Sequence, residues 1–454
     1  MTVDSPERSQ PRATLSVPDG IGMIIGVVIG IGIFRTPSLV AANVDSEWAF
    51  MGLWLAGGLV TMAGALVYAE LTAHYPSAGG EYTFLSRAFG RNVAMLFGWG
   101  RISVVQTGAI PAVAFVFGDY AQTVLPLGTV GVPIYAALAL GLLTFVNLRG
   151  THQGKSAQNA LSFLTFGTLM LILIVALPLA APVETLNPSS APSPAGGAYG
   201  LAMVFILLTY GGWNEVAYIS ADVRDGRRNM LRVLVLGTLA ITAIYLMINL
   251  AFLSALGLEG LRASNTVAAD VMQSAIGEIG SVIVSLAICI AALSTLNASI
   301  FTGARVYFAL GSDLGASRTL GAWNSDGNNP RFAILIQSAV ALTLVVFGAM
   351  QRDGFQAMVE YTAPAFWFFM VLIGLSYFIL RHRDGHASLL LTVPLFPVVP
   401  ALFTGACSYL LYASLMHTGR GALVGAAVLL AGVPIIFLVQ RRGGMLPAAV
   451  SKSL

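Results

Sequence analysis

Long apolar runs separated by short polar segments recur along the whole chain, and they restrict its fold more than any other feature. A helix needs roughly 20 mostly apolar residues to cross about 30 Å of hydrocarbon. Runs of that kind lie near residues 18–41, 48–72, 92–118, 131–148, 158–180, 198–220, 232–256, 270–308, 331–349, 355–380, 388–413 and 421–440. With 57% hydrophobic and 9% charged residues, the composition also excludes an ordinary soluble domain.

The runs lack the residue-by-residue alternation of a membrane barrel, so their backbone groups must be satisfied within helices. We therefore predict an all-α polytopic membrane protein with about 12 transmembrane helices. The run at 270–308 is too long for one crossing, and its first part is expected to form an outer loop or a short surface helix. The loops between the runs are too short to hold a domain with its own core.

The basic residues predict the orientation of these helices. If the N-terminus is cytoplasmic, only Arg262, Arg352 and Arg420 fall in outer segments, and Arg35 and Arg101 fall within runs. All the other Lys and Arg residues, out of 23, fall in inner segments. The positive-inside rule then places both termini in the cytoplasm and the chain in the cell inner membrane. Because the basic residues mark inner loops, they indicate no nucleic-acid partner.

Two of the runs are interrupted by glycine at corresponding depths. The first contains Gly26, Gly30 and Gly32, and the sixth contains Gly211-Gly212 followed by Trp-Asn-Glu. Close packing of a neighbouring helix is an alternative explanation for the four-residue spacing of the first glycines, but it does not explain Gly32 or the glycine pair. Paired interruptions indicate the midplane binding site of an inverted-repeat transporter.

An unwound turn at half-depth exposes backbone N–H and C=O groups where lipid offers them no partner. A zwitterion satisfies both kinds of group. Its carboxylate suits the N-terminal end of a half-helix, and its ammonium suits freed carbonyls at a C-terminal end. The interruptions therefore favour an amino acid as the ligand.

Four blocks of this sequence resemble the amino acid–polyamine–organocation superfamily, and within it the L-amino acid transporter family. The blocks are Gly26–Phe34 with Pro37, Gly64–Leu71 with Pro76–Tyr82, Tyr210–Asn214 with Asp225–Asn229, and Asn297–Thr302 with Arg305. The resemblance implies a LeuT-type fold in which helices 1 and 6 are discontinuous. Its implied parts are an N-terminal tail (1–17), two inverted five-helix repeats (18–180 and 198–380), two further helices (388–440) and a C-terminal tail (441–454).

The resemblance also implies that backbone groups of helices 1 and 6 bind the substrate. The implied substrate-binding residues are Val28, Ile29, Gly30, Ile31, Gly32, Ile33, Leu208, Tyr210, Gly211, Gly212 and Asn214. Ile31 stands where relatives usually have a small or hydroxyl residue, which puts a side-chain contact to the carboxylate in doubt. Leu208 stands where many relatives have a bulky aromatic gate, so the outer lid is expected to be smaller. Asn214 is expected to hold the broken helix or to touch the substrate.

A coupling ion is expected because of a second departure from the family. Many relatives carry a lysine in helix 5, in place of a coupling sodium ion, where this chain has Thr165. The hydroxyls of Ser294 and Thr295, with freed carbonyls near Gly26, offer the oxygen ligands that a hard cation needs. We hypothesise a sodium ion or a water there; the alternative is that both hydroxyls bond back to their own helix. No cofactor other than a coupling ion, Na⁺ or H⁺, is expected, and no metal site.

Three charged residues are candidates for coupling or gating. Arg101 lies well inside the third run, where a charge is expensive. Snorkelling toward the cytoplasm is the favoured interpretation, and an ion pair with a partner that the sequence does not identify is the alternative. Glu215 follows the interruption in helix 6 and is the better proton-relay candidate. Glu70, near the inner end of helix 2, is expected to fix structure or the inner gate.

These features predict a secondary active transporter that works by alternating access, as an exchanger or an ion-coupled symporter. A neutral amino acid is favoured because neither broken helix carries an obvious counter-charge, and a cationic amino acid or polyamine is the alternative. An enzyme is not expected, because no nucleophile, metal or phosphate motif is present. A channel stays open as an alternative, since broken helices also line pores. The expected partners are the amino acid and the lipid bilayer, with no obligate protein partner.

Overall fold

The computed structural model describes residues 16–77, 80–149, 155–176, 198–215, 226–313, 322, 324, 329–384, 392–416 and 420–442. Helices make up nearly all of this part of the chain, with one isolated bridge between Asn324 and Asn329. The first half contains α1 (Val17–Val28), η1 (Ile31–Phe34), α2 (Thr36–Ala41), α3 (Glu47–His74), α4 (Glu81–Phe89), α5 (Arg91–Gly100), η2 (Arg101–Val105), α6 (Gln106–Val124), α7 (Gly131–Leu148) and α8 (Lys155–Ala176). The second half contains α9 (Tyr199–Thr209), α10 (Gly226–Ala263), α11 (Val267–Ile276), α12 (Glu278–Asp313), α13 (Arg331–Ala349), α14 (Gly354–Asp384), α15 (Val398–Met416) and α16 (Arg420–Arg442).

This architecture confirms the predicted all-α polytopic membrane fold. Within the described residues, 8 helices are long and apolar enough to cross a membrane, and further apolar helices are shorter. The long run at 270–308 is divided as expected into α11 and the crossing helix α12. Gly277 separates them at a φ of 78°, a conformation that glycine adopts without steric cost. The division into two inverted repeats stays a prediction.

Several predicted boundaries are wrong, and each error has a local cause. Residues 81–89 were expected in a loop, yet they form the amphipathic helix α4. The eleventh run was expected to begin at residue 388, but α15 begins at Val398, after a turn that contains Pro394 and Pro397. Helix α10 begins before its apolar run and α12 ends after its run, because polar residues can continue the backbone hydrogen-bond ladder outside the hydrocarbon. The predicted end of the seventh run at residue 256 coincides with a kink in α10 at Gly257, which has a φ of 66°.

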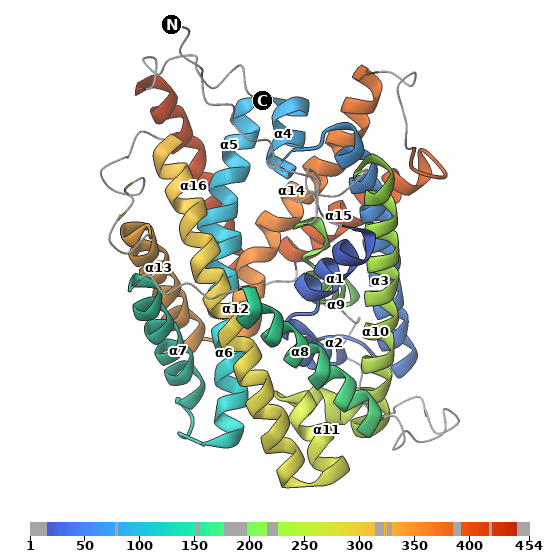
Figure 1. The fold of residues 1–454 in the computed structure, drawn as a ribbon, viewed down its shortest axis with the longest axis vertical. Helices are drawn as coiled ribbons and strands as arrows, with labels where there is room; N and C mark the ends of the chain where they lie inside the picture. Colours follow the sequence, from blue (N-terminus) through green and yellow to red (C-terminus); the bar gives the residue numbers. More distant parts are fainter. Residues whose placement is uncertain are drawn as a thin grey trace, which may run out of the picture.

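The short helices α1, α2 and α9 occupy the middle of the bundle (Figure 1). On one side they pack against α3 and α10, and on the other η1 reaches α12, which packs on α6. Gly57 and Gly58 let α3 approach α9 and α10 closely. An added Cβ would lie 2.4 Å from Ile206 of α9 at the first glycine and 2.4 Å from Thr242 of α10 at the second.

The two ends of the bundle are named here by the helices that they carry. Helix α4 lies at one end, together with the last turns of α14, and this end is called the α4 side (Figure 1). Helix α11 lies at the opposite end, near the connection between α6 and α7, and this end is called the α11 side. The central short helices lie between these two ends.

Candidate functional site

The predicted interruption in helix 1 is present. Helix α1 ends at Val28, and Gly30 takes an extended conformation with φ −99° and ψ −169°. The chain then forms the 3-10 turn η1 before α2 begins at Thr36, with Pro37 in its first turn. Because the two helical pieces are joined by extended backbone, the last carbonyls of α1 are released from their own helix.

The predicted interruption in helix 6 is present as well. Helix α9 ends at Thr209, and Gly212 has a φ of 107°, a conformation that residues with a side chain rarely adopt. A 3-10 turn follows at Trp213–Glu215, in which the Glu215 N–H donates to the Gly212 carbonyl at 3.0 Å. Glycine is therefore required at the second interruption for a conformational reason and not only for packing.

The two interruptions face each other. A Cβ added at Gly212 would lie 3.0 Å from Val27 Cγ1, and one added at Gly32 would lie 3.5 Å from Thr209. The Thr209 and Thr36 hydroxyls are hydrogen-bonded at 2.7 Å. The sequence predicted two interruptions at equal depth, and the structure brings them into contact.

One tyrosine hydroxyl reaches a released carbonyl from each interrupted helix. Tyr245 of α10 is fully buried, and its Oη lies 2.8 Å from the Val28 carbonyl and 3.2 Å from the Thr209 carbonyl. Its ring packs against Tyr210 and Trp54, with centroids 4.9 and 5.9 Å away. Sequence reasoning missed Tyr245, because nothing in the sequence links a mid-helix tyrosine to the ends of two distant helices.

The residues predicted to bind substrate gather around these two interruptions. Val28, Ile29, Ile31 and Ile33 are buried, whereas Gly30, Gly32, Leu208, Gly211 and Gly212 are partly exposed. The Tyr210 hydroxyl donates to the Trp54 carbonyl at 3.2 Å. Asn214 accepts from the Gly212 N–H at 3.3 Å and donates to Glu81 at 2.9 Å, so its side chain holds the broken helix.

Arg101 lies between two carboxylates beside the second interruption. Its Nη2 is 2.6 Å from Glu215 Oε1, and its Nη1 is 3.3 Å from Glu81 Oε2. Glu81 is almost fully buried and also accepts from the Tyr68 hydroxyl at 2.6 Å. The favoured interpretation of Arg101 as a snorkelling cation is therefore wrong. Its partners lie on α4, in a segment that was expected to be a loop, and just after the interruption of helix 6. The apolar runs alone do not show that these two segments are close in space.

Arg101 begins a π-helical turn, η2, that interrupts helix 3. Two tyrosine hydroxyls from different helices donate to carbonyls of this turn. Tyr307 of α12 reaches the Ile102 carbonyl at 2.9 Å, and Tyr361 of α14 reaches the Ser103 carbonyl at 2.8 Å. Such turns occur frequently at functional sites, since the extra residue re-aims the side chains around it.

A cavity of about 120 Å³ opens between this cluster and the second interruption. Arg101, Glu81 and Glu215 supply its charged wall, and Gly212 and Asn214 line it from the interruption. Apolar side chains of α5, η2 and α14 form its apolar wall, and Gln106 of α6 also lines it. One water needs roughly 10–15 Å³ measured in this way, so the cavity has room for several waters or a side chain. It lies on the α4 side of the interruptions.

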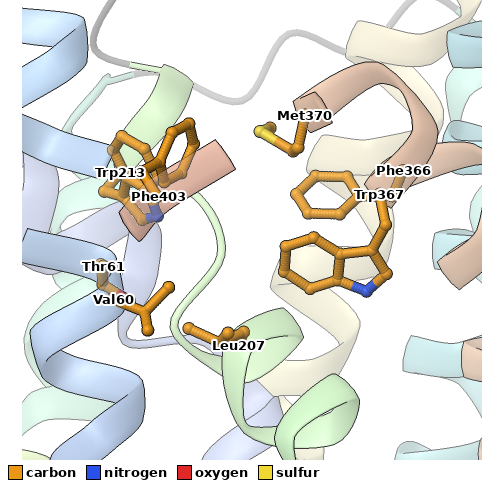
Figure 2. A pocket seen from close by; sticks show the side chains of 8 residues that line it. All are labelled: Val60, Thr61, Leu207, Trp213, Phe366, Trp367, Met370 and Phe403. Atoms are coloured by element: carbon orange, nitrogen blue, oxygen red, sulfur yellow. The ribbon is translucent and has the colours of Figure 1, made fainter. Parts of the chain in front are cut away.

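A second cavity, of about 20 Å³, shares the lining residues Phe366 and Met370 with the first. Figure 2 shows Trp213 and Phe403 on one side of this space and Phe366, Trp367 and Met370 on the other. With Val60 and Leu207 as further neighbours its lining is mostly apolar, and its volume suits at most about one water. It is too small to hold an amino acid.

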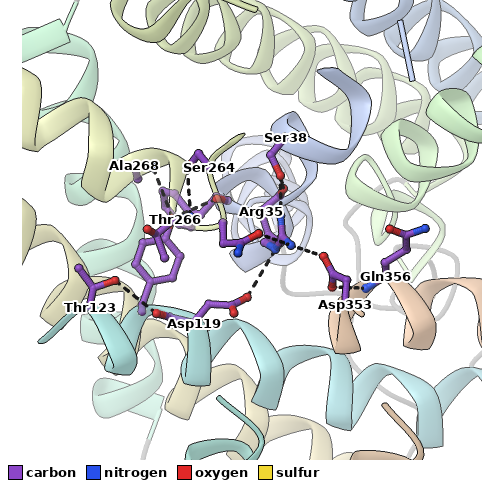
Figure 3. A network of polar contacts seen from close by, with 12 residues as sticks. Arg35, Ser38, Asp119, Thr123, Ser264, Thr266, Ala268, Asp353 and Gln356 are labelled. Carbon is purple, nitrogen blue, oxygen red and sulfur yellow. Dashed lines mark hydrogen bonds and ion pairs between the residues drawn. The ribbon is translucent and has the colours of Figure 1, made fainter. Parts of the chain in front are cut away.

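On the α11 side, a buried arginine network closes the bundle (Figure 3). Arg35 follows η1 directly, and its side chain is only 4% exposed. It pairs with Asp119 of α6 at 3.4 Å and with Asp353, which precedes α14. It also donates to Ser38 and, at 3.0 Å, to Asn265 before α11. Sequence reasoning gave these residues no role, although the charge of Arg35 inside the first apolar run, and that of Asp119 directly after the third, were the available signals.

The candidate ion ligands differ in their hydrogen bonding. Ser294 Oγ is buried and has no hydrogen-bond partner in the described structure, whereas Thr295 Oγ1 donates to the Ala291 carbonyl at 3.0 Å. Both lie on α12, which packs against η1. Thr165 is half-buried on α8, which also packs against α12, and Gly26 is exposed. Among the described residues, no group of His, Cys, Asp or Glu could hold a metal ion.

Glu70 is part of a separate cluster on the α4 side. Its carboxylate accepts from the Tyr377 hydroxyl at 2.8 Å, from Arg381 at 2.8 Å and from the Val393 N–H at 2.6 Å. These contacts tie α3 to α14 and to the segment before α15. They agree with the expectation that Glu70 fixes structure or the inner gate.

Comparison with known proteins decides the family. Residues 15–439 match the amino acid permease family. The chain belongs to this family. The match confirms the resemblance to the amino acid–polyamine–organocation superfamily on which the site residues were predicted.

The permease is also similar to transporters of known name along most of its length. It is 28% identical over 433 residues to the serine/threonine exchanger SteT of Bacillus subtilis (strain 168), covering 92% of this chain and 95% of the relative. It is 26% identical over 418 residues to the b(0,+)-type amino acid transporter 1 of Homo sapiens, covering 90% and 84%. It is 27% identical over 438 residues to the large neutral amino acids transporter small subunit 2 of Mus musculus, covering 94% and 81%.

Replacing Tyr245 by phenylalanine tests the link between the two interruptions. The variant removes the hydroxyl that lies beside both carbonyls. The Val28 carbonyl keeps the Gly30 N–H as a donor at 2.7 Å, whereas loss of the hydroxyl beside the Thr209 carbonyl is expected to cost about 1–3 kcal/mol. We expect a lower melting temperature of the purified permease and weaker amino acid binding, both measured by thermal shift. Tyr412→Phe is the control, because the Tyr412 side chain is exposed on α15. Equal behaviour of the two variants would show that the hydroxyl is dispensable.

Proposed function

We propose that this permease is a secondary active transporter that carries a neutral amino acid through the gap between its two interrupted helices. The observation that carries the proposal is the contact between the interruptions at Gly30–Gly32 and at Gly211–Gly212. The carbonyl ends of α1 and α9 and the N–H groups that begin η1 converge there. A carboxylate and an ammonium one carbon apart are complementary to such a pair of helix ends.

The two sides of this gap differ in a way that alternating access requires. On the α11 side the Arg35 network is buried and joins η1, α6 and the segments before α11 and α14. On the α4 side the cavity next to Gly212 contains partly exposed charged groups. These differences support a conformation that is closed on the α11 side, and transport would require the Arg35 network to open. In the proposed orientation the α4 side is cytoplasmic and the membrane is the cell inner membrane.

The names of the relatives support amino acid transport, and one of them is named an exchanger. Another is named a small subunit. We also propose that this permease needs no obligate partner protein. Transport activity of this chain reconstituted alone would support that proposal.

Counterflow in proteoliposomes tests the proposed function. Vesicles loaded with an unlabelled neutral amino acid should accelerate uptake of the labelled one, because an exchanger couples the two movements. In Gly212→Ala, the strained backbone and the close Val27 side chain should lower the rate by about tenfold, the effect of 1–2 kcal/mol. Gly52→Ala is the matched control, because an added Cβ at Gly52 meets nothing within 4 Å. Dissipation of the gradient without counterflow would identify a pore and sink the proposal.

We also propose that a sodium ion couples to transport at Ser294. The support is a buried hydroxyl without a partner, on a helix that packs against η1. Proton coupling is the alternative. Uptake is expected to fall when choline replaces sodium, and Ser294→Ala should need more sodium for half-maximal uptake. Ser285→Ala is the matched control, because Ser285 Oγ is also buried without a partner on α12, about 13 Å along the axis. Rates that do not depend on sodium at constant pH would rule out this ion.

A further inference from the structure

The charged side chains that line the larger cavity have no counterpart in a neutral substrate. One guanidinium, from Arg101, lies between two carboxylates, and the remaining residues that line this cavity are uncharged. The two carboxylates differ in their surroundings. Glu81 is buried and receives hydrogen bonds from Tyr68 and Asn214 as well as from Arg101. Glu215 is 42% exposed, and Arg101 alone bonds its carboxylate in the described structure.

This arrangement favours a positive charge in the cavity. An anionic group would meet two carboxylates that already share one cation, which is unfavourable where the dielectric constant is low. A cationic group would meet the exposed face of Glu215 and would leave Arg101 with its second partner, Glu81. The charge of the wall therefore selects for cations and against anions.

The shape of the cavity fits a long side chain with a charged end. Phe97, Val105 and Phe369 form an apolar wall beside the charged one. The side chains of lysine and arginine have the matching form, because an apolar stem carries a charged head. Glu215 lies three residues after Gly212 in a 3-10 turn, about 6 Å at roughly 2 Å per residue. A basic side chain spans that distance from a backbone held at the interruption.

We propose that Glu215 is the acceptor for the positive side-chain group of a basic amino acid, with Arg101 as a positioning residue. The permease would then bind substrates with an ammonium or guanidinium side chain in addition to neutral ones. The inference rests on the proposed function, since it places the amino and carboxyl groups of the substrate at the interruptions. It differs from the sequence-based expectation, which found no counter-charge in helix 6 because Glu215 was considered only as a proton relay.

Arginine and citrulline are the matched probes, because they have the same length and differ in side-chain charge. In competition with labelled neutral amino acid uptake, arginine should inhibit wild type at about tenfold lower concentration than citrulline, the effect of 1.4 kcal/mol. Glu215→Gln should remove this advantage while citrulline inhibition changes less than twofold. Glu215→Asp, which keeps the charge, should restore most of it. Glu259→Gln is the control, because Glu259 pairs with Arg262 at an exposed position outside the cavity.

The outcomes separate the inference from the function on which it rests. Equal inhibition of wild type by the two probes, or an equal loss for both in Glu215→Gln, would overturn the Glu215 subsite and leave amino acid transport intact. A pH dependence of neutral uptake that disappears in Glu215→Gln, without arginine selectivity, would identify Glu215 as a proton acceptor and also overturn it. Absence of uptake of any amino acid by wild type would instead refute the proposed function.

Discussion

The structure depends on one constraint: backbone polar groups inside a lipid bilayer must find partners within the protein. Two helices leave their hydrogen-bond ladders in the middle of the bundle, and the surrounding residues partly compensate for this. Tyr245 reaches a carbonyl from each helix, and Asn214 bonds the Gly212 amide. In the proposed function, a zwitterion would provide further partners for the backbone groups at the two interruptions. The same constraint explains why the interruptions are costly, and it is the basis for proposing an amino acid as their ligand.

Charge is arranged in a similar way on the two sides of this gap. On each side an arginine lies between two acidic residues, Asp119 and Asp353 around Arg35 and Glu81 and Glu215 around Arg101. The two clusters differ in exposure, since the Arg35 side chain is 4% exposed and the Arg101 side chain 24%. Breaking a buried ion pair costs several kcal/mol, so opening the α11 side needs a compensating interaction. In the proposed mechanism, substrate binding at the interruptions would supply that interaction.

The sequence predicted the elements whose signals are local. Apolar runs of membrane-spanning length predicted the helices, and glycines at corresponding positions of two runs predicted both interruptions. The sequence contained no signal for contacts between segments that are distant in the chain. Arg101 was placed correctly inside helix 3, but its partners lie on α4 and after α9. Tyr245 and the Arg35 network were missed for the same reason, because apart from Ser38 their partners lie on other helices or on the segments before them.

The central claim is that the interrupted helices hold the amino acid between them, and an experimental structure of the purified permease with a bound neutral amino acid tests it most directly. The account predicts density for the ligand carboxylate at the amides of residues 30–32. It predicts the ammonium at carbonyls near Val28 and Tyr210, with both helices interrupted. Continuous helices at both positions, or a ligand bound away from them, would contradict it.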